Sequence, residues 1–178
     1  MKRLRRKKLL LLSLVIFLFV IMPVAYNSSN VYGVNEKDVS GINKILQSGS
    51  DEIKRWNFDG AIAYFNKAIS LDEKNPSAYV GLGGVYLRKN NSDKAIAYFS
   101  QAISLDEKNP YAYVGLGDVY LQKDNSDKAI AYFNKAISLD EKNPYAYSGL
   151  GFAYLQKGNF NKAIGYFNQA ISLDEKNT

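Results

Sequence analysis

Hydrophobic positions between residues 76 and 177 recur with a short and a long period. Within short stretches, apolar and aromatic residues are three or four positions apart, as on one face of an α-helix. The whole pattern then repeats every 34 residues without insertion, in segments 76–109, 110–143 and 144–177. The first two segments differ at only six of 34 positions. A fixed period of this length indicates a solenoid of stacked two-helix units.

Segment 110–143 shows how one unit is built. Asn109 can cap a helix that starts at Pro110, because proline needs no amide partner there. The polar run 123–126 should end this helix: Asp124 or Asn125 tolerates a left-handed backbone, and Ser126 can cap the next helix. The unit is therefore predicted to be a helical hairpin with a loop of about four residues. Small residues that would let its two helices approach closely are Gly117, Ala129 and Ala136.

The same unit carries a recognisable set of large and small residues. In the first full copy these are Tyr79, Leu82, Gly83, Tyr86, Ala95, Phe99 and Ala102, and the next two copies hold identical residues at the equivalent positions. This pattern resembles the tetratricopeptide repeat. The resemblance implies an all-α fold, a right-handed α-solenoid of antiparallel helix pairs, with repeats at 76–109, 110–143 and 144–177. The pattern departs from the family at Ser92 and Ser126, where an aromatic residue is expected.

The residues before the three full copies divide into two parts. Residues 42–75 are predicted to be a degenerate repeat that caps the array, because their second half keeps the pattern whereas the first half has Ile45, Ser48 and Glu52 at the positions of Tyr, Leu and Tyr. Residues 26–41 lack periodicity and are rich in Asn, Ser and Gly. They are predicted to be a flexible linker.

The N-terminus has the order typical of an export signal. Six basic residues in the first eight are followed by 17 uncharged, largely apolar residues at 9–25, and then by a polar stretch. Segment 1–25 is predicted to be a signal peptide or an uncleaved signal anchor, with an N-terminal hydrophobic helix. If it is uncleaved, residues 9–25 hold the chain in a membrane. We expect the repeats on the extracytoplasmic side, anchored to the membrane, or secreted or periplasmic after cleavage.

Composition argues against most enzyme chemistry. The chain has no Cys and no His, so it lacks thiolate nucleophiles, thiolate metal ligands and the usual base near neutral pH. The repeated Asp-Glu pairs, such as Asp140-Glu141, occur once in every unit and are better explained as solvated turns than as a catalytic pair. Outside the first eight residues, basic and acidic residues balance, which disfavours a nucleic-acid partner. We expect no catalysis, no cofactor and no metal site.

The family resemblance implies a concave groove lined by the first helix of each repeat. The residues expected to line it, and to bind a protein or peptide, are Ser77, Val80, Leu87, Arg88, Tyr111, Val114, Asp118, Leu121, Gln122, Tyr145, Phe152, Leu155 and Gln156. The Lys and Asn with which some family members hold a C-terminal carboxylate are missing, since Val114 and Asp118 stand there in the second copy. The groove therefore suits an apolar or aromatic peptide or helix.

Two functions follow from these observations. The first is a non-catalytic scaffold that binds protein partners in the cell envelope. The second is a self-associating structural protein, a possible homo-oligomer that stacks through the apolar face of the last repeat, where Ile164, Phe167, Ile171 and Leu173 would meet another copy.

Overall fold

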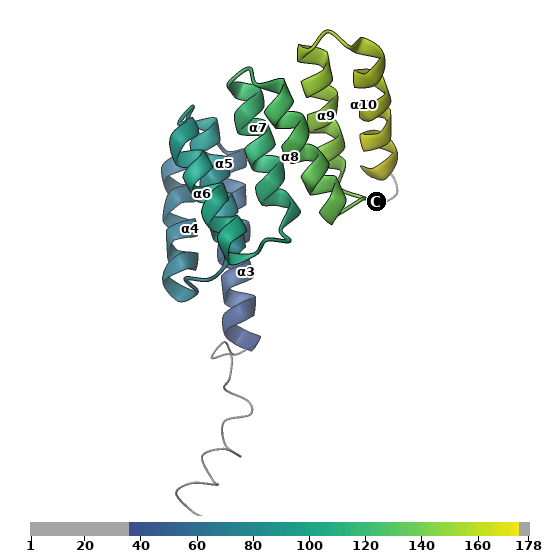
Figure 1. Ribbon diagram of the computed structural model, residues 1–178. Coiled ribbons are helices and arrows are strands. Elements are labelled where there is room, and N and C mark those ends of the chain that lie inside the picture. Colours follow the sequence, from purple (N-terminus) through teal and green to yellow (C-terminus); the bar gives the residue numbers. More distant parts are fainter. Residues whose placement is uncertain (1–35, 175–178) are drawn as a thin grey trace, which may run out of the picture. The chain divides into compact units, whose positions relative to one another are not determined.

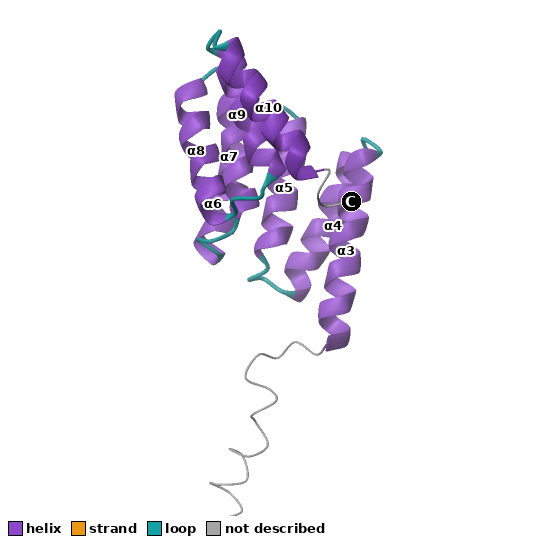
Figure 2. Cartoon of the chain, turned by 90° about the vertical axis from the view of Figure 1, so that its right-hand side faces the viewer, coloured by secondary structure: helices purple, strands orange, loops and turns teal. Residues whose placement is uncertain are grey.

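The computed structural model describes residues 36–174, and the side chains from residue 40 onward. This part of the chain consists of eight α-helices joined by short turns and contains no strand (Figures 1 and 2). The helices are α3 (Glu36–Lys54), α4 (Phe58–Leu71), α5 (Pro76–Arg88), α6 (Ser92–Leu105), α7 (Pro110–Gln122), α8 (Ser126–Leu139), α9 (Pro144–Gln156) and α10 (Phe160–Asp174). The predicted all-α fold is confirmed, whereas the predicted right hand of the superhelix stays a prediction.

The helices from α5 onward stack as successive antiparallel pairs. Helix α5 packs on α6, α7 on α8 and α9 on α10, and neighbouring pairs meet through α6 against α7 and α8 against α9 (Figure 1). The first helices also contact one another, α5 with α7 and α7 with α9. The result is a continuous row of first helices, which positions the groove described below.

The N-terminal helix begins earlier than the sequence analysis predicted. Helix α3 starts at Glu36, so residues 36–41 of the predicted linker are helical. No proline or glycine interrupts residues 36–40, so the sequence permits a helix there. Residues 42–174 belong to one compact unit. The predicted hydrophobic segment 9–25 and linker residues 26–35 lie outside the described residues, and no described helix is both long and apolar enough to cross a membrane.

Asparagine side chains cap the N-termini of the helices in the repeats. Asn109 Oδ1 accepts hydrogen bonds from the backbone N–H groups of Tyr111 at 3.1 Å and Ala112 at 3.3 Å, which confirms the predicted cap. The second helix of the unit is capped by Asn125, whose Oδ1 accepts from Lys128 N at 3.1 Å. The predicted Ser126 cap is therefore wrong. Asp124 takes the left-handed backbone, with φ of 54°, which places Asn125 at the cap and makes Ser126 the first helical residue.

The repeated Asp-Glu pairs form the turns between repeats. Asp140 Oδ1 accepts from Lys142 N at 3.0 Å, and the Asp140 carbonyl accepts from Asn143 N at 3.2 Å. The neighbouring Glu141 is exposed. The aspartate thus fixes the turn with its side chain and backbone, while the glutamate faces solvent.

A phenylalanine in each second helix holds neighbouring repeats together. Phe133 on α8 is fully buried, and its ring occupies the space where Cβ atoms would lie at Gly117 on α7 and Gly149 on α9. Phe65 and Phe99 lie between glycines in the same way. The sequence analysis predicted close approach at Gly117 within one repeat. It missed the glycine two positions earlier, Gly81, Gly115 or Gly149, which contacts the phenylalanine of the preceding repeat.

This contact predicts opposite effects for two glycine-to-alanine changes. In Gly115→Ala, the new methyl group would overlap the buried ring of Phe99, and we expect the free energy of unfolding to fall by about 1 to 3 kcal/mol. In Gly165→Ala on α10, the new methyl group meets no other atom, and we expect a gain of about 0.5 to 1 kcal/mol from helix propensity. Chemical denaturation of both variants measures the difference. Equal stabilities would contradict the packing described here.

Stacked tyrosines join the two helices within each repeat. The rings of Tyr120 on α7 and Tyr132 on α8 lie 5.4 Å apart and nearly parallel, and Lys128 Nζ lies 5.0 Å from the Tyr120 ring centre. Tyr86 with Tyr98, and Tyr154 with Tyr166, form the same stacks at the same spacing. These contacts join the two helices of each full repeat in the same geometry.

Candidate functional site

A cavity of about 590 Å³ lies along the row of first helices. Helix α5 contributes Val80, Gly84, Leu87 and Arg88, helix α7 contributes Tyr111, Val114, Gly115 and Asp118, and Tyr145 of α9 and Phe99 of α6 complete it. We call this site the groove cavity. It brings together seven of the residues that the sequence analysis placed in the groove: Val80, Leu87, Arg88, Tyr111, Val114, Asp118 and Tyr145.

Aromatic rings form one side of the groove cavity. Tyr111 and Tyr145 are 52% and 64% exposed, although they are large and apolar in most of their surface. Their ring centres lie 6.5 Å apart and the rings are tilted by 59°. Rings of this kind offer apolar contact area and a polar tip, which suits binding of a partner side chain.

Gly84 leaves free space in the groove cavity. A Cβ atom added at Gly84 on α5 would meet no other atom within 4 Å, so this position opens into free space. The next repeat has Asp118 at the equivalent position and the last repeat has Phe152. The absence of a side chain at Gly84 therefore leaves space on the α5 part of the groove cavity.

Asp118 is the acidic residue of the groove cavity. It is partly buried among apolar neighbours, and this burial raises the pKa of its carboxyl group from the usual 3.8 to about 7. Among the described residues, the ion pairs within 4.0 Å do not include Asp118. Burial opposes the charged form when no opposite charge is near. The groove cavity thus holds a carboxyl group that is about half ionised near neutral pH.

Arg88 is the basic residue of the groove cavity, and its guanidinium group lies near an aromatic ring outside the cavity. The central carbon of its guanidinium group lies 5.8 Å from the ring centre of Trp56. Trp56 follows α3, has a left-handed backbone with φ of 61° and is 69% exposed. The arginine and tryptophan form a cation–π pair at the edge of the site.

Two other predicted groove residues, Gln122 and Gln156, do not line the groove cavity and link neighbouring repeats. Gln122 Nε2 donates to the backbone carbonyl of Leu87 at 3.5 Å, and Gln156 Nε2 donates to that of Leu121 at 3.0 Å. Ser126 Oγ donates to Gln156 Oε1 at 2.8 Å. Each glutamine therefore connects its repeat to the C-terminal end of the first helix of the preceding repeat. The sequence feature that could have indicated these hydrogen bonds is a Gln at the same position in two successive copies.

The other four predicted groove residues lie outside the cavity. Leu121 is partly buried and packs against the core around Phe133. Phe152 is exposed and meets Phe167 of α10 edge to face, with ring centres 5.0 Å apart. Leu155 and Ser77 are exposed. None of the four lines the groove cavity.

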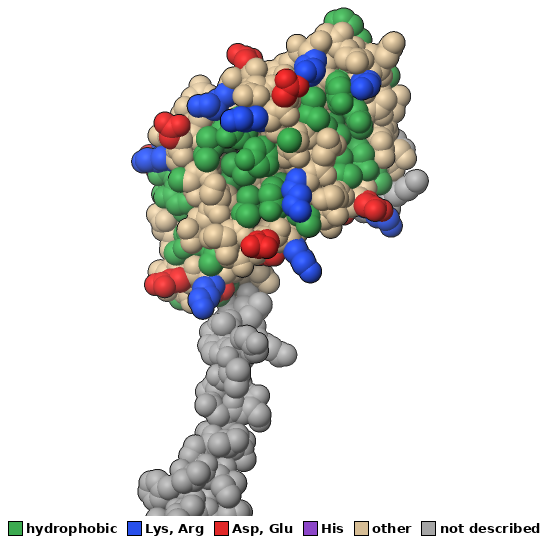
Figure 3. Space-filling view, in the orientation of Figure 1, with side chains coloured by type: hydrophobic (Ala, Val, Ile, Leu, Met, Phe, Trp, Pro, Cys, Tyr) green, Lys and Arg blue, Asp and Glu red, His purple; other side chains and the backbone are tan. Residues whose placement is uncertain are grey.

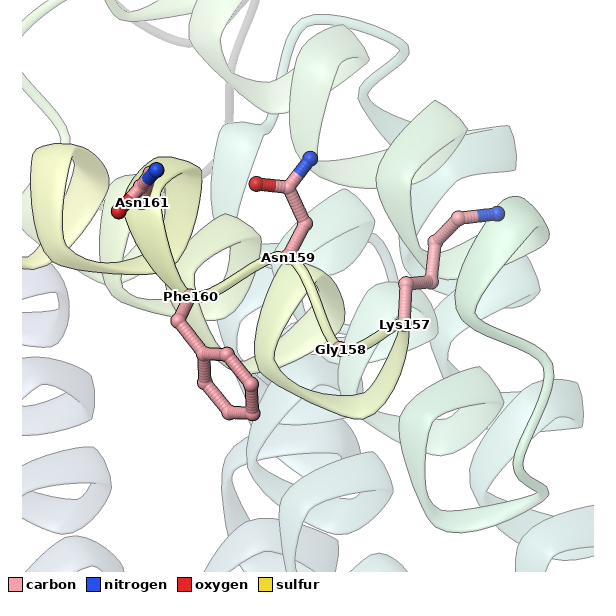
Figure 4. Close-up of a pocket in the computed structure, with 5 residues that line it drawn as sticks. All are labelled: Lys157, Gly158, Asn159, Phe160 and Asn161. Carbon is pink, nitrogen blue, oxygen red and sulfur yellow. The ribbon is translucent and has the colours of Figure 1, made fainter.

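A second hollow, of about 390 Å³, lies at the turn between α9 and α10. Its five residues are consecutive, Lys157 to Asn161, and Figure 4 shows Phe160 pointing away from the side taken by Lys157 and Asn159. Side chains that diverge from one turn do not form a convergent binding site. Within residues 36–174, no group of three or more acidic side chains could hold a metal ion.

Hydrophobic side chains are also visible on the surface of the repeats. Figure 3 shows them in separate patches on one face, with Lys, Arg, Asp and Glu around the edges. Exposed apolar patches with polar borders are typical of protein-binding surfaces.

Comparisons with known proteins identify the repeats. Models described as tetratricopeptide repeat match residues 46–111, 90–135 and 144–177, and one described as TPR repeat matches residues 117–158. A search of curated proteins found no match.

Solved structures give the same result. The crystal structure of MamA is 30% identical over 80% of this chain and 83% of that chain, with a TM-score of 0.59. A thermophilic TPR protein of Thermus thermophilus is 17% identical over 75% of each chain, with a TM-score of 0.68. A chain of the Cut9-Hcn1 hetero-tetramer of APC/C is 24% identical over 74% of this chain and 25% of that chain, with a TM-score of 0.66. The chain belongs to the tetratricopeptide repeat family.

Proposed function

We propose that this protein is a non-catalytic interaction module that binds an apolar or aromatic segment of a partner protein in the groove cavity. Tetratricopeptide repeats are typically non-catalytic and generally bind protein partners. The observation that carries the proposal is the cavity of about 590 Å³, in which Tyr111 and Tyr145 are exposed beside Val80 and Val114. Large exposed rings next to apolar side chains favour burial by a partner.

The proposal includes a location in the cell envelope. It is supported by the six basic residues in the first eight and the 17 uncharged residues that follow at 9–25. Such a segment directs export, and it holds the repeats on the extracytoplasmic side if it is not cleaved. The alternative function, a structural protein that stacks on its own copies, is not favoured by the comparisons.

Site-specific crosslinking in the native cell tests the groove. A photoreactive phenylalanine analogue at position 145 should form adducts with a partner, because Tyr145 lines the groove cavity and is 64% exposed. The same analogue at position 64 is a matched control, since Tyr64 is 38% exposed on α4 and does not line the cavity. We expect adducts from position 145 and few from position 64.

A groove variant completes this test. Tyr111→Ala should reduce adduct yield at position 145 by about fivefold or more, because aromatic side chains at the centre of an interface carry much of its binding energy. Adducts of equal yield at positions 64 and 145, or adducts that Tyr111→Ala leaves unchanged, would contradict binding in the groove.

A further inference from the structure

We propose that the groove cavity selects partner segments in which a lysine or arginine side chain is flanked by apolar or aromatic residues, and that the Asp118 carboxylate binds the cationic group. This inference rests on the proposed function and gives it a chemical specificity. It makes Asp118 a specificity-determining residue of an otherwise apolar site.

Comparison of the repeats within the chain shows that the fold does not require this acid. The position holds Gly84 in one repeat, Asp118 in the next and Phe152 in the last. Of the six differences between the first two full repeats, three fall at positions predicted to line the groove: Ser77 against Tyr111, Gly84 against Asp118 and Arg88 against Gln122. The repeats therefore share the residues that build the hairpin and differ where a ligand would lie.

The surroundings of Asp118 favour a cation as the ligand. The carboxyl group borders the groove cavity, and no described Lys or Arg lies within ion-pair distance of it. The neighbouring helices bring Val80 and Arg88 from α5, Phe99 from α6 and Tyr145 from α9 to the same cavity. Arg88 is already paired with the ring of Trp56. A partner cation would supply the missing opposite charge.

The same surroundings disfavour other ligands. An acidic segment would bring like charge next to a carboxylate that is poorly solvated, which is unfavourable. A purely apolar segment would cover the carboxyl group without giving it a partner, and burial of an unpaired polar group is also unfavourable. A Lys or Arg side chain avoids both penalties, because its aliphatic part packs on apolar surface and its charged end reaches the acid.

The aromatic rings of the cavity complete the recognition. Tyr111 and Tyr145 line the same space as Asp118, with ring centres 6.5 Å apart. Rings in this position can contact the apolar neighbours of the basic residue and can also attract its positive charge. The raised pKa of the Asp118 carboxyl group, about 7, agrees with a site that lacks a cation until a partner binds.

Peptide selection tests the inference without a known partner. The full chain, kept soluble in detergent, is used to select from a random peptide library on phage, in parallel with Asp118→Asn and Asp93→Asn. Asp118→Asn keeps the shape and removes the charge. Asp93→Asn is the matched control, because it makes the same change at an exposed acid of α6 that does not line the groove cavity. We expect wild type and Asp93→Asn to enrich peptides with Lys or Arg beside apolar residues. Asp118→Asn should enrich apolar peptides without the basic residue.

Affinities of a selected peptide give the size of the effect. Replacing its Lys by norleucine should weaken binding to wild type by about tenfold at pH 8 and change binding to Asp118→Asn by less than about twofold. For wild type, the affinity of the Lys peptide should fall by about tenfold in total between pH 8 and pH 5 and then level off, because protonation of the carboxylate removes only its contact with the Lys. The norleucine peptide should not show this fall.

The outcomes separate this inference from the proposed function. If wild type and Asp118→Asn enrich the same peptides, with or without basic residues, Asp118 does not determine specificity and the inference is wrong, while binding in the groove stands. If no peptide is enriched by any of the three proteins, the proposed function fails together with the inference.

Discussion

Phe133→Ala is expected to lower the free energy of unfolding by about 3 to 5 kcal/mol, the largest effect of any single truncation proposed for this chain. Phe133 is fully buried, and its ring fills the space between Gly117 of its own repeat and Gly149 of the next. Glycine has no side chain that could move into the vacated volume. The cavity would therefore stay open at the junction of two repeats, and both would lose packing. Denaturant titration followed by circular dichroism measures the loss.

Phe167→Ala is the matched control for this prediction. Phe167 holds the same position in the last repeat, but it is only partly buried and lies against one close glycine, Gly151. We expect a loss smaller than that of Phe133→Ala by about 1 kcal/mol or more, because a partly exposed site leaves a smaller cavity. Equal losses at both positions would show that the shared contact with the next repeat adds no stability.

Asp118→Asn is expected to stabilise the protein at pH 8 and to have little effect at pH 4. The pKa of the Asp118 carboxyl group is about 7 in the folded protein and 3.8 in the unfolded chain. Between these two values the unfolded chain releases the proton and the folded protein keeps it, so rising pH favours unfolding. Below pH 3.8 both states are protonated, and above pH 7 both are ionised. The destabilisation by Asp118 therefore grows between about pH 4 and 7 and then stays constant.

The size of this effect follows from the same pKa. One pKa unit corresponds to about 1.4 kcal/mol, so a shift of about three units sets an upper value near 4 kcal/mol, and water in the open groove lowers it to about 2 to 4 kcal/mol. The measurement is the difference in unfolding free energy between wild type and Asp118→Asn from pH 4 to 8. Because all other titrating groups are common to both proteins, they cancel in the difference. A difference that does not change with pH would contradict an elevated Asp118 pKa.

The fold was predictable because the sequence of each repeat contains its own helix starts, caps and loop residues. Asn109 and Pro110 define a helix start through a cap and a preset backbone angle, and the structure starts α7 at Pro110. The polar loop was also predictable, although the capping residue was misplaced by one position. Asn125 and Ser126 are both good caps, and the left-handed backbone at Asp124 places Asn125 at the cap. The start of α3 was missed because residues 36–41 have no apolar periodicity to mark them.

The candidate site was predictable in part. Helical position alone placed Val80, Tyr111 and Asp118 on the groove side of their helices, and the structure finds them around one cavity. Position alone could not show that Gln122 and Gln156 reach back to the preceding repeat, because their hydrogen bonds join residues 35 positions apart. Nor could it show the elevated pKa of Asp118, which depends on burial by side chains from other helices.

The placement of each buried phenylalanine between two glycines has a consequence for how such a chain can change its length. Phe99 meets Gly115 of the next repeat in the way that Phe133 meets Gly149. Removal of residues 110–143 as a block would therefore bring Phe99 against Gly149 and restore an equivalent junction. The same deletion would remove Asp118, the acidic residue of the groove cavity. Loss of one copy would thus leave the packing between repeats intact and at the same time change the chemistry of the groove cavity.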